Sequence, residues 1–529
     1  MPRSTLTRRD CLKAFAGVAA GALAAPAVFS RESRSMKQPN IILIMNDDMG
    51  FSDLGCYGSE IATPNLDMLA ANGMRFTQFY NTARCCPSRA SLLTGLYAHQ
   101  AGVGDMTRNL GVPAYQGYLN DRCVTIAEAL RPAGYRTAMS GKWHVGEDRP
   151  NWPTDRGFER YFGLISGASS YWRLDQGRQM AMDDKPWTPP DDGSFYMTDA
   201  ITDHAVKLIG ENAKADKPFF HYVAYTAPHW PLHAHAADID KYRGKYLKGW
   251  DQLRLERHAR MKQMGIVDGK WKLSERHPKA PPWDEVEDKE TRDLKMAVYA
   301  AQIECMDRGI GRIMQAVRRA GIEQDTLVLF LADNGGCAEE INRGQAGAAP
   351  GTKESYTSYG LPWANASNTP LRLFKVWVHE GGISTPLIAY WPGVIAKGGL
   401  SHEVGHVIDL LPTCLEAAGA PYPRQHNGKE ITPVEGRSLL PVLRGGKRQG
   451  HDAICWEHEG HRAIRKGDWK LVGQRGGEWE LYNLAEDRTE TNDLIAREPA
   501  RAAELQAMWE AWAQRVGVEP FEKLRAQRK

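Results

Sequence analysis

The sequence lacks the charge pattern of a nucleic-acid-binding protein. Its formal net charge is +3 over 529 residues, and no long block of like charge occurs. Residues 1–37 hold seven Lys or Arg and two Asp or Glu, so the rest of the chain carries a formal charge of −2. Binding to nucleic acid requires concentrated positive charge, and we therefore expect no nucleic-acid partner. Internal repeats and low-complexity segments are absent as well.

Cysteine is scarce, with nine residues in the whole chain. No CxxC pair suggests a zinc cluster, and no closely spaced set suggests a disulfide framework. Cys305 and Cys414 lie in apolar helical patterns and are expected to be buried. The adjacent Cys85 and Cys86 need a separate explanation. Beyond the N-terminal segment the cysteines are Cys56, Cys85, Cys86, Cys123, Cys305, Cys337, Cys414 and Cys455.

Beyond the N-terminus the sequence also lacks an apolar run long enough to span a membrane. At the N-terminus, a charged segment at 7–13 precedes an Ala-rich run at 14–25. The small residues at 25–27 then resemble a signal-peptide cleavage site. This pattern predicts an export signal over residues 1–27, similar to a bacterial twin-arginine signal, although Cys11 stands where Phe is usual. We expect a periplasmic or secreted protein without stable membrane insertion after signal removal. A membrane anchor is the alternative.

Strand-like apolar runs alternate with amphipathic helices, which predicts an α/β fold with a parallel-rich sheet flanked by helices. A long helix is expected over 294–320, with Gly321 ending it. Residues 236–292 form a polar, charged insertion. The clearest predicted strands are 41–45, 135–139, 219–225, 327–331 and 386–390.

The pattern of predicted secondary structure changes near residue 451. Short β-like segments follow at 463–471 and 479–481, and then a helix that contains Leu505 and Trp512. We therefore predict a catalytic domain over 38–450 and a small C-terminal α+β subdomain over 451–529.

Polar side chains follow four of the predicted strands, where open α/β sheets bind their ligands. Each could have a structural role: the aspartates could cap a helix, the Asn-Gly pair could form a turn, and the histidines could be packing residues. Their occurrence after four strands favours a common site. The residues are Asp47 and Asp48, Lys142 and His144, His229, and Asp333 and Asn334.

The residue types indicate the chemistry of this site. Three carboxylates and one carboxamide form an oxygen-only donor set, which suits Ca²⁺ or Mg²⁺ better than zinc. The two histidines then remain available for proton transfer. A lysine and an arginine nearby imply an anionic substrate group, so the set points to transfer of a tetrahedral oxyanion. Composition does not separate sulfate from phosphate.

The stretch Cys85-Cys86-Pro87-Ser88-Arg89, followed by Leu92-Leu93-Thr94-Gly95, resembles the signature of the sulfatase family. In that family the first cysteine, here Cys85, is oxidised to formylglycine, an aldehyde, by a separate generating enzyme before folding. Its hydrate has two hydroxyls: one attacks sulfur and the other expels sulfate, which divides the reaction into two easier steps. Cys86 occupies the variable position. Two buried thiols before a helix would not explain the full signature.

The resemblance extends over about 38–525 and is greatest to bacterial arylsulfatases, which implies an alkaline-phosphatase-like fold. Further matching motifs lie at 63–67, 226–229, 332–336, 368–383 and 481–494. Leu373 and Phe374 stand where many relatives have glycines, so that loop is expected to differ in shape.

The resemblance also implies residue roles. Asp47, Asp48, Asp333, Asn334 and the modified Cys85 would bind Ca²⁺, with Mg²⁺ possible. Arg89 would hold the formylglycine hydrate, and Lys142 and Lys375 the sulfate oxygens. His144 would act as the base in sulfate elimination, His229 would protonate the leaving alcohol, and Asp333 would also orient or deprotonate the attacking hydroxyl.

We therefore predict a sulfuric ester hydrolase acting on an aryl or carbohydrate sulfate monoester. One alternative is a phosphonate or phosphodiester hydrolase, because such relatives share the fold and use formylglycine. The other is a non-catalytic polysaccharide-binding relative. Ser88 and the arylsulfatase-like flanks argue against the first, and the complete set of polar residues argues against the second.

Overall fold

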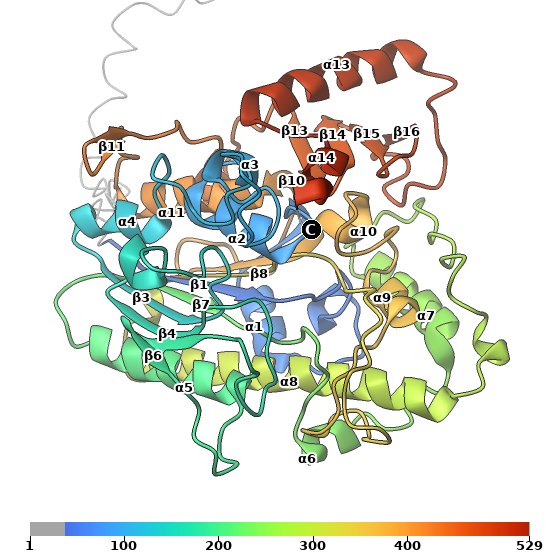
Figure 1. The fold of residues 1–529 in the computed structure, drawn as a ribbon. Coiled ribbons are helices and arrows are strands. Elements are labelled where there is room, and N and C mark those ends of the chain that lie inside the picture. Colours follow the sequence, from blue (N-terminus) through green and yellow to red (C-terminus); the bar gives the residue numbers. More distant parts are fainter. Residues whose placement is uncertain (1–37, 528–529) are drawn as a thin grey trace, which may run out of the picture. The chain divides into compact units, whose positions relative to one another are not determined.

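A computed structural model of the protein describes residues 38–527. The predicted export signal lies outside these residues. The main element is a ten-stranded mixed sheet with the order β10-β2-β9-β8-β1-β7-β3-β4-β5-β6 (Figure 1). Its strands are β1 (Asn40–Asn46), β2 (Met74–Tyr80), β3 (Arg136–Gly141), β4 (Arg160–Leu164), β5 (Met180–Met182), β6 (Lys185–Trp187), β7 (Phe219–Ala224), β8 (Thr326–Ala332), β9 (Ser384–Tyr390) and β10 (Gly399–His406).

The sheet has a hydrophobic core on each face. Along β1, Ile42 and Ile44 pack into one core and Ile41, Leu43 and Met45 into the other, because successive side chains of a strand point to opposite faces. Helices α1, α5 and α8 contribute to the first core, whereas α2, α4 and α11 contribute to the second (Figure 1). A strand buried on both faces needs a continuous apolar run, which β1 and β8 have.

The remaining elements connect or cover the sheet. A two-stranded ribbon is formed by β11 (Gln425–His426) and β12 (Lys429–Glu430). The helices are α1 (Pro64–Asn72), α2 (Cys85–Thr94), α3 (Ala98–Ala101), α4 (Ile126–Leu130), α5 (Met197–Asn212), α6 (Ala236–Asp240), α7 (Gly249–Gln263), α8 (Lys289–Arg319), α9 (Leu361–Ser367), α10 (Glu380–Ile383), α11 (Leu410–Ala418), α12 (Leu440–Leu443), α13 (Pro499–Val516) and α14 (Phe521–Gln527).

The five predicted strands are all present, and the α/β prediction is confirmed. The strand predicted at 386–390 is β9, which runs antiparallel to both of its neighbours, so the sheet is mixed. The helix predicted over 294–320 begins five residues earlier, at Lys289, and Gly321 follows its end with a φ of 70°. The insertion at 236–292 contains α6 and α7.

The C-terminal part contains a separate antiparallel sheet. Its strands are β13 (Ile454–His458), β14 (His461–Lys466), β15 (Trp469–Gly473) and β16 (Trp479–Asn483), and α13 packs against it. The segment expected at 463–471 is thus two strands, because Gly467, with a φ of 59°, allows a tight turn between them. The chain from Gln38 onward forms one compact unit, and the domain boundary at 450 stays a prediction.

A buried ionic network links the two sheets. Glu380 of α10 binds Lys470 of β15 at 2.9 Å and Arg488 at 2.9 Å, and all three side chains are fully buried. Buried charges need such pairing because an isolated buried charge would be strongly unfavourable.

Among helices within residues 38–527, none combines the length and the apolar character required to cross a bilayer.

Candidate functional site

The predicted site residues meet at one edge of the large sheet. Strands β8, β1, β7 and β3 are consecutive and parallel, so their carboxyl ends lie side by side. This arrangement brings together the polar residues that follow each of the four strands. Arg89 of α2 and Lys375, from the loop before α10, reach the same group.

Asp333 is at the centre of this group. Its Oδ1 accepts a hydrogen bond from the backbone N–H of Asp48 at 3.3 Å, and its Oδ2 lies 2.8 Å from Nη2 of Arg89. Burial and the nearby charge of Asp47 raise the pKa of Asp333 well above its usual value, although Arg89 opposes the shift. A cation bound beside Asp333 would oppose this shift and favour the carboxylate.

Asp47 is stabilised as a carboxylate by a buried lysine. Its Oδ2 lies 2.5 Å from Nζ of Lys142, and both side chains are fully buried. Burial raises the pKa of Asp47, but Lys142, His229 and Arg89 outweigh it and lower the pKa to about 2. Burial is the largest single influence on Lys142 and lowers its pKa, but Asp47, Cys85 and Asp333 together outweigh burial and raise the pKa, so the pair is charged at neutral pH.

Three side-chain oxygens at this edge have no hydrogen-bond partner among the described residues: Oδ1 of Asp47, Oδ1 of Asn334 and Oδ1 of Asn46. Asn334 donates its Nδ2–H to Oδ1 of Asp48 at 2.7 Å, which leaves its own oxygen available. Unpartnered buried oxygens beside two carboxylates fit a hard divalent cation, because such ions take carboxylate and amide oxygens. Asn46 was not among the predicted ligands, although it directly precedes Asp47.

Cys85 is the first residue of α2, and its Sγ lies 3.4 Å from Nδ1 of His144. Burial is the main cause that lowers the pKa of His144, so its imidazole is neutral at pH 7. Gly167 packs directly behind this ring: a Cβ at Gly167 would lie 2.4 Å from Nε2 of His144. No sequence pattern indicated Gly167, because only the tertiary contact shows its role.

His229 and Lys375 lie together on the other side of Asp48. Lys375 Nζ is 2.8 Å from Oδ2 of Asp48 and 3.3 Å from Nε2 of His229, and that nitrogen is 3.3 Å from Asp48 Oδ2. Nδ1 of His229 lies 2.6 Å from the carbonyl oxygen of Trp230 and must donate to it. Nε2 is therefore the ring nitrogen of His229 that faces the site and is free to exchange a proton with a bound group.

The backbone is strained around this site. Several non-glycine residues have positive φ, which is uncommon and costs free energy unless the surroundings enforce it. Leu373 is one of them, with a φ of 65°, so the loop takes a conformation that suits glycine although this chain has leucine. The others near the site are Asp48, Ala83, His144 and Val376.

An ionic contact next to Cys85 was not predicted. Arg84 lies 3.3 Å from Glu339, which also accepts a 2.7 Å hydrogen bond from Nε1 of Trp230. Burial raises the pKa of Glu339, but Lys375, Arg84 and His229 outweigh it, so Glu339 is ionised. The position of Arg84 before the signature could have indicated it, whereas Glu339 is 255 residues away in sequence and is placed only by the fold.

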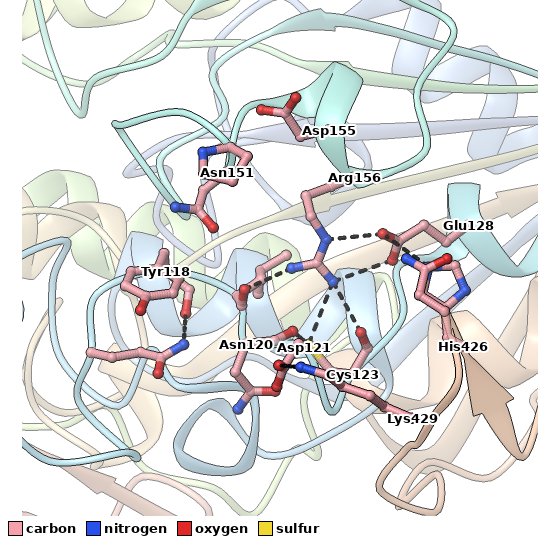
Figure 2. Close-up of a pocket in the computed structure, with 14 residues that line it drawn as sticks. Tyr118, Asn120, Asp121, Cys123, Glu128, Asn151, Asp155, Arg156, His426 and Lys429 are labelled. Atoms are coloured by element: carbon pink, nitrogen blue, oxygen red, sulfur yellow. Dashed lines mark hydrogen bonds and ion pairs between the residues drawn. The ribbon is translucent and has the colours of Figure 1, made fainter.

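A pocket elsewhere in the fold contains none of the predicted site residues. Figure 2 shows that Arg156 crosses it and bonds Glu128 and backbone oxygens. The guanidinium is thereby engaged within the protein, so this pocket does not resemble an anion-binding site. Its lining includes Tyr118, Asn120, Asn151, His426 and Lys429.

Comparison with known proteins identifies the family of this chain. The sulfatase family model matches residues 39–420, and the model for the C-terminal part of N-sulphoglucosamine sulphohydrolase matches residues 372–515. An uncharacterized sulfatase of Schizosaccharomyces pombe is 35% identical over 93% of this chain and 96% of its own length. An arylsulfatase of Klebsiella aerogenes is 34% identical over 77% of this chain and 92% of its own length.

Solved structures support the same fold. The crystal structure of Ps i-CgsB in complex with k-i-k-neocarrahexaose has a TM-score of 0.69 and covers 92% of this chain and 99% of its own, at 24% identity. The family models and the two relatives identify the chain more specifically than the fold does. The chain therefore belongs to the sulfatase family, whose members hydrolyse sulfate esters.

Proposed function

We propose that this enzyme hydrolyses an organic sulfate monoester, aryl or carbohydrate, by means of a formylglycine formed from Cys85. The main support is the position of Cys85, which lies within the C-x-P-S-R signature and 3.4 Å from the neutral imidazole of His144. The modified residue would supply a hydrated aldehyde as a renewable nucleophile. We further propose that a separate generating enzyme converts Cys85 before the chain folds, and that the protein is exported to the periplasm or secreted.

The buried cations of the site would bind the substrate and the nucleophile. Lys142 and Lys375 are charged, and both are held by aspartates, so they can donate hydrogen bonds to sulfate oxygens without reorganisation. Arg89 is fixed by Asp333 and by the carbonyl oxygen of Lys142 at 3.0 Å, which suits a role in holding the hydroxyls at position 85. Preorganised charge of this kind favours a transition state in which negative charge moves between oxygens.

Proton transfer would be divided between two histidines. His144 is neutral and beside Cys85, so it can accept the proton when sulfate is eliminated. His229 presents Nε2 to the site between Asp48 and Lys375, so it can donate to the leaving oxygen. Asp333 would orient or deprotonate the attacking hydroxyl.

The metal set that we propose is Asp47, Asp48, Asp333, Asn334 and the modified Cys85. A bound Ca²⁺ would supply Lewis-acid stabilisation of the sulfate oxygens. We expect one such ion per chain, measured by elemental analysis, with metal–oxygen distances of about 2.3–2.6 Å in a crystal structure. Asp333→Asn should lose the ion. Distances of about 2.0–2.1 Å would indicate Mg²⁺ instead, and two ions held by His144 and His229 would contradict the proposal.

Turnover assays test the function. Correctly modified protein should release inorganic sulfate from aryl sulfates, sulfated sugars or both, while phosphonate esters and phosphodiesters react more slowly. Peptide mass spectrometry should find an aldehyde at position 85. Active protein with only an unmodified thiol would refute the mechanism, and preferred turnover of phosphonates would favour the alternative. Sugar substrates belong in the panel because the Ps i-CgsB structure, which has this fold, is a complex with k-i-k-neocarrahexaose.

Gly167→Ala should lower kcat for every sulfate ester. The added Cβ would lie 2.4 Å from the His144 ring, which must move away from Cys85. Misplacing a catalytic group by about 1 Å can cost on the order of 10²-fold in rate. Gly210→Ala is the control, because nothing lies within 4 Å of the added carbon in α5. An unchanged kcat in Gly167→Ala, with the fold intact, would remove His144 from the proposed role.

A further inference from the structure

A second cluster of metal-ligating side chains lies outside the catalytic set. Asp105, in the loop after α3, His458, at the end of β13, and Glu459, in the following turn, place one ligand atom each within 4.8 Å of one another. Two of these residues come from the C-terminal sheet, and the third is more than 350 residues earlier in the chain. The cluster therefore bridges the C-terminal sheet and the part of the chain that carries the nucleophile.

His458 is the unusual member. Its side chain has an exposed fraction of 0%, and neither ring nitrogen has a hydrogen-bond partner within residues 38–527. A buried imidazole without a partner is unfavourable, because both nitrogens have lost water without replacement. One nitrogen of a neutral imidazole has a lone pair that a metal ion can use. Something in addition to the described side chains is expected to satisfy it.

The surroundings are compatible with a cation. Glu459 reaches solvent with 19% of its side chain exposed, which provides a path for an ion, and its Oε2 lies 3.7 Å from Nη1 of Arg475. A carboxylate has lone pairs for both a metal and an ion pair. Arg84 is another cation near His458, and its guanidinium is held by Glu339 at 3.3 Å.

We propose that Asp105, His458 and Glu459 form a second metal site, which takes a zinc-class divalent ion. One imidazole and two carboxylates suit Zn²⁺, whereas the oxygen-only catalytic set suits Ca²⁺. Three protein ligands and a water complete the usual tetrahedral coordination. The ion would join the β13–β14 turn to the loop after α3, a structural role separate from turnover.

Zinc binding to the modified, Ca²⁺-loaded protein tests this proposal. Anomalous diffraction at the zinc edge should place an ion among the three side chains, with a Zn–N distance of about 2.0–2.1 Å. Calorimetry should show Zn²⁺ binding that Glu459→Gln weakens at least about tenfold, since even outer-shell changes cost about 10–100-fold. His402→Gln, which alters an exposed histidine on β10, should bind zinc as the unaltered protein does.

Glu459→Gln is preferred to a change at His458, because a partly exposed side chain is safer to alter than a buried one. Only water beside His458, or zinc solely at the catalytic carboxylates or Cys85, would overturn the proposal. The readout is the position and affinity of the ion, so it does not depend on which ester the enzyme hydrolyses, or on whether it hydrolyses one.

Discussion

Cys85→Ala should abolish sulfate release, with a loss on the order of 10⁴–10⁶-fold, as found when a covalent nucleophile is removed. The reason is that Cys85 holds the modified signature position 3.4 Å from Nδ1 of His144, whereas Cys86, whose sulfur also lies within 4.8 Å of a ring nitrogen of His144, holds the variable position. Cys85→Ser gives a more informative result. A serine has one hydroxyl, so it could accept a sulfuryl group but has no second hydroxyl with which to expel it.

Single-turnover measurements distinguish the two variants. Cys85→Ser should release up to one equivalent of alcohol and then stop, with the sulfuryl group detected on the peptide by mass spectrometry. Cys85→Ala should release none. Cys86→Ala is the matched control, because Cys86 is also buried in α2 but occupies the variable signature position. Sustained turnover by either Cys85 variant, or complete inactivity of folded, aldehyde-bearing Cys86→Ala, would contradict the assignment.

His229→Ala should lose more rate with poor leaving groups than with good ones. A sugar or alkyl alkoxide needs a proton as its bond to sulfur breaks, whereas a nitrophenolate hardly does. General acid catalysis contributes about 10²–10⁴-fold, so the difference across a leaving-group series should be large. The measurement is the slope of log kcat/KM against the pKa of the leaving alcohol, which should become steeper in the variant.

Lys142→Ala serves as the comparison for His229→Ala. Its Nζ contacts Asp47 and is proposed to hold the sulfate, so its loss should slow all esters to a similar extent. Both variants must be checked for aldehyde and metal content, because Lys142 and His229 each contact a proposed metal ligand. If His229→Ala slows every ester equally, the acid role passes to Lys375, whose Nζ is 3.3 Å from His229 Nε2.

The sequence predicted that several polar residues meet at one edge of the sheet, because these residues directly follow strands; their catalytic and metal-binding roles stay predictions. Asp47 and Asp48 after β1, and Asp333 and Asn334 after β8, are each adjacent to a fully buried apolar run. Such runs are local signals, and parallel strands place their carboxyl ends on one edge. The same local pattern did not indicate β2 or β10, because neither was separated from its surroundings by a clear apolar run.

Contacts between distant segments could not be predicted in this way. Gly167 behind His144 is identified only by the space around it, and Glu339 beside Arg84 depends on how two loops pack. The unpartnered imidazole of His458 is recognisable only when its surroundings are known. These features depend on tertiary packing, which hydrophobic periodicity and residue spacing do not encode.

The sequence by itself determined the family, the α/β class and the residue types of the site, because a contiguous signature and buried strand runs are local properties of the chain. Only the tertiary structure decided the strand order β8-β1-β7-β3, the reversal of β9 and the pairing of each buried cation with its carboxylate. The physical reason is that a buried charged group is stable only when neighbouring groups of opposite charge or hydrogen-bond partners compensate its lost hydration. Which neighbours meet depends on long-range packing rather than on sequence separation.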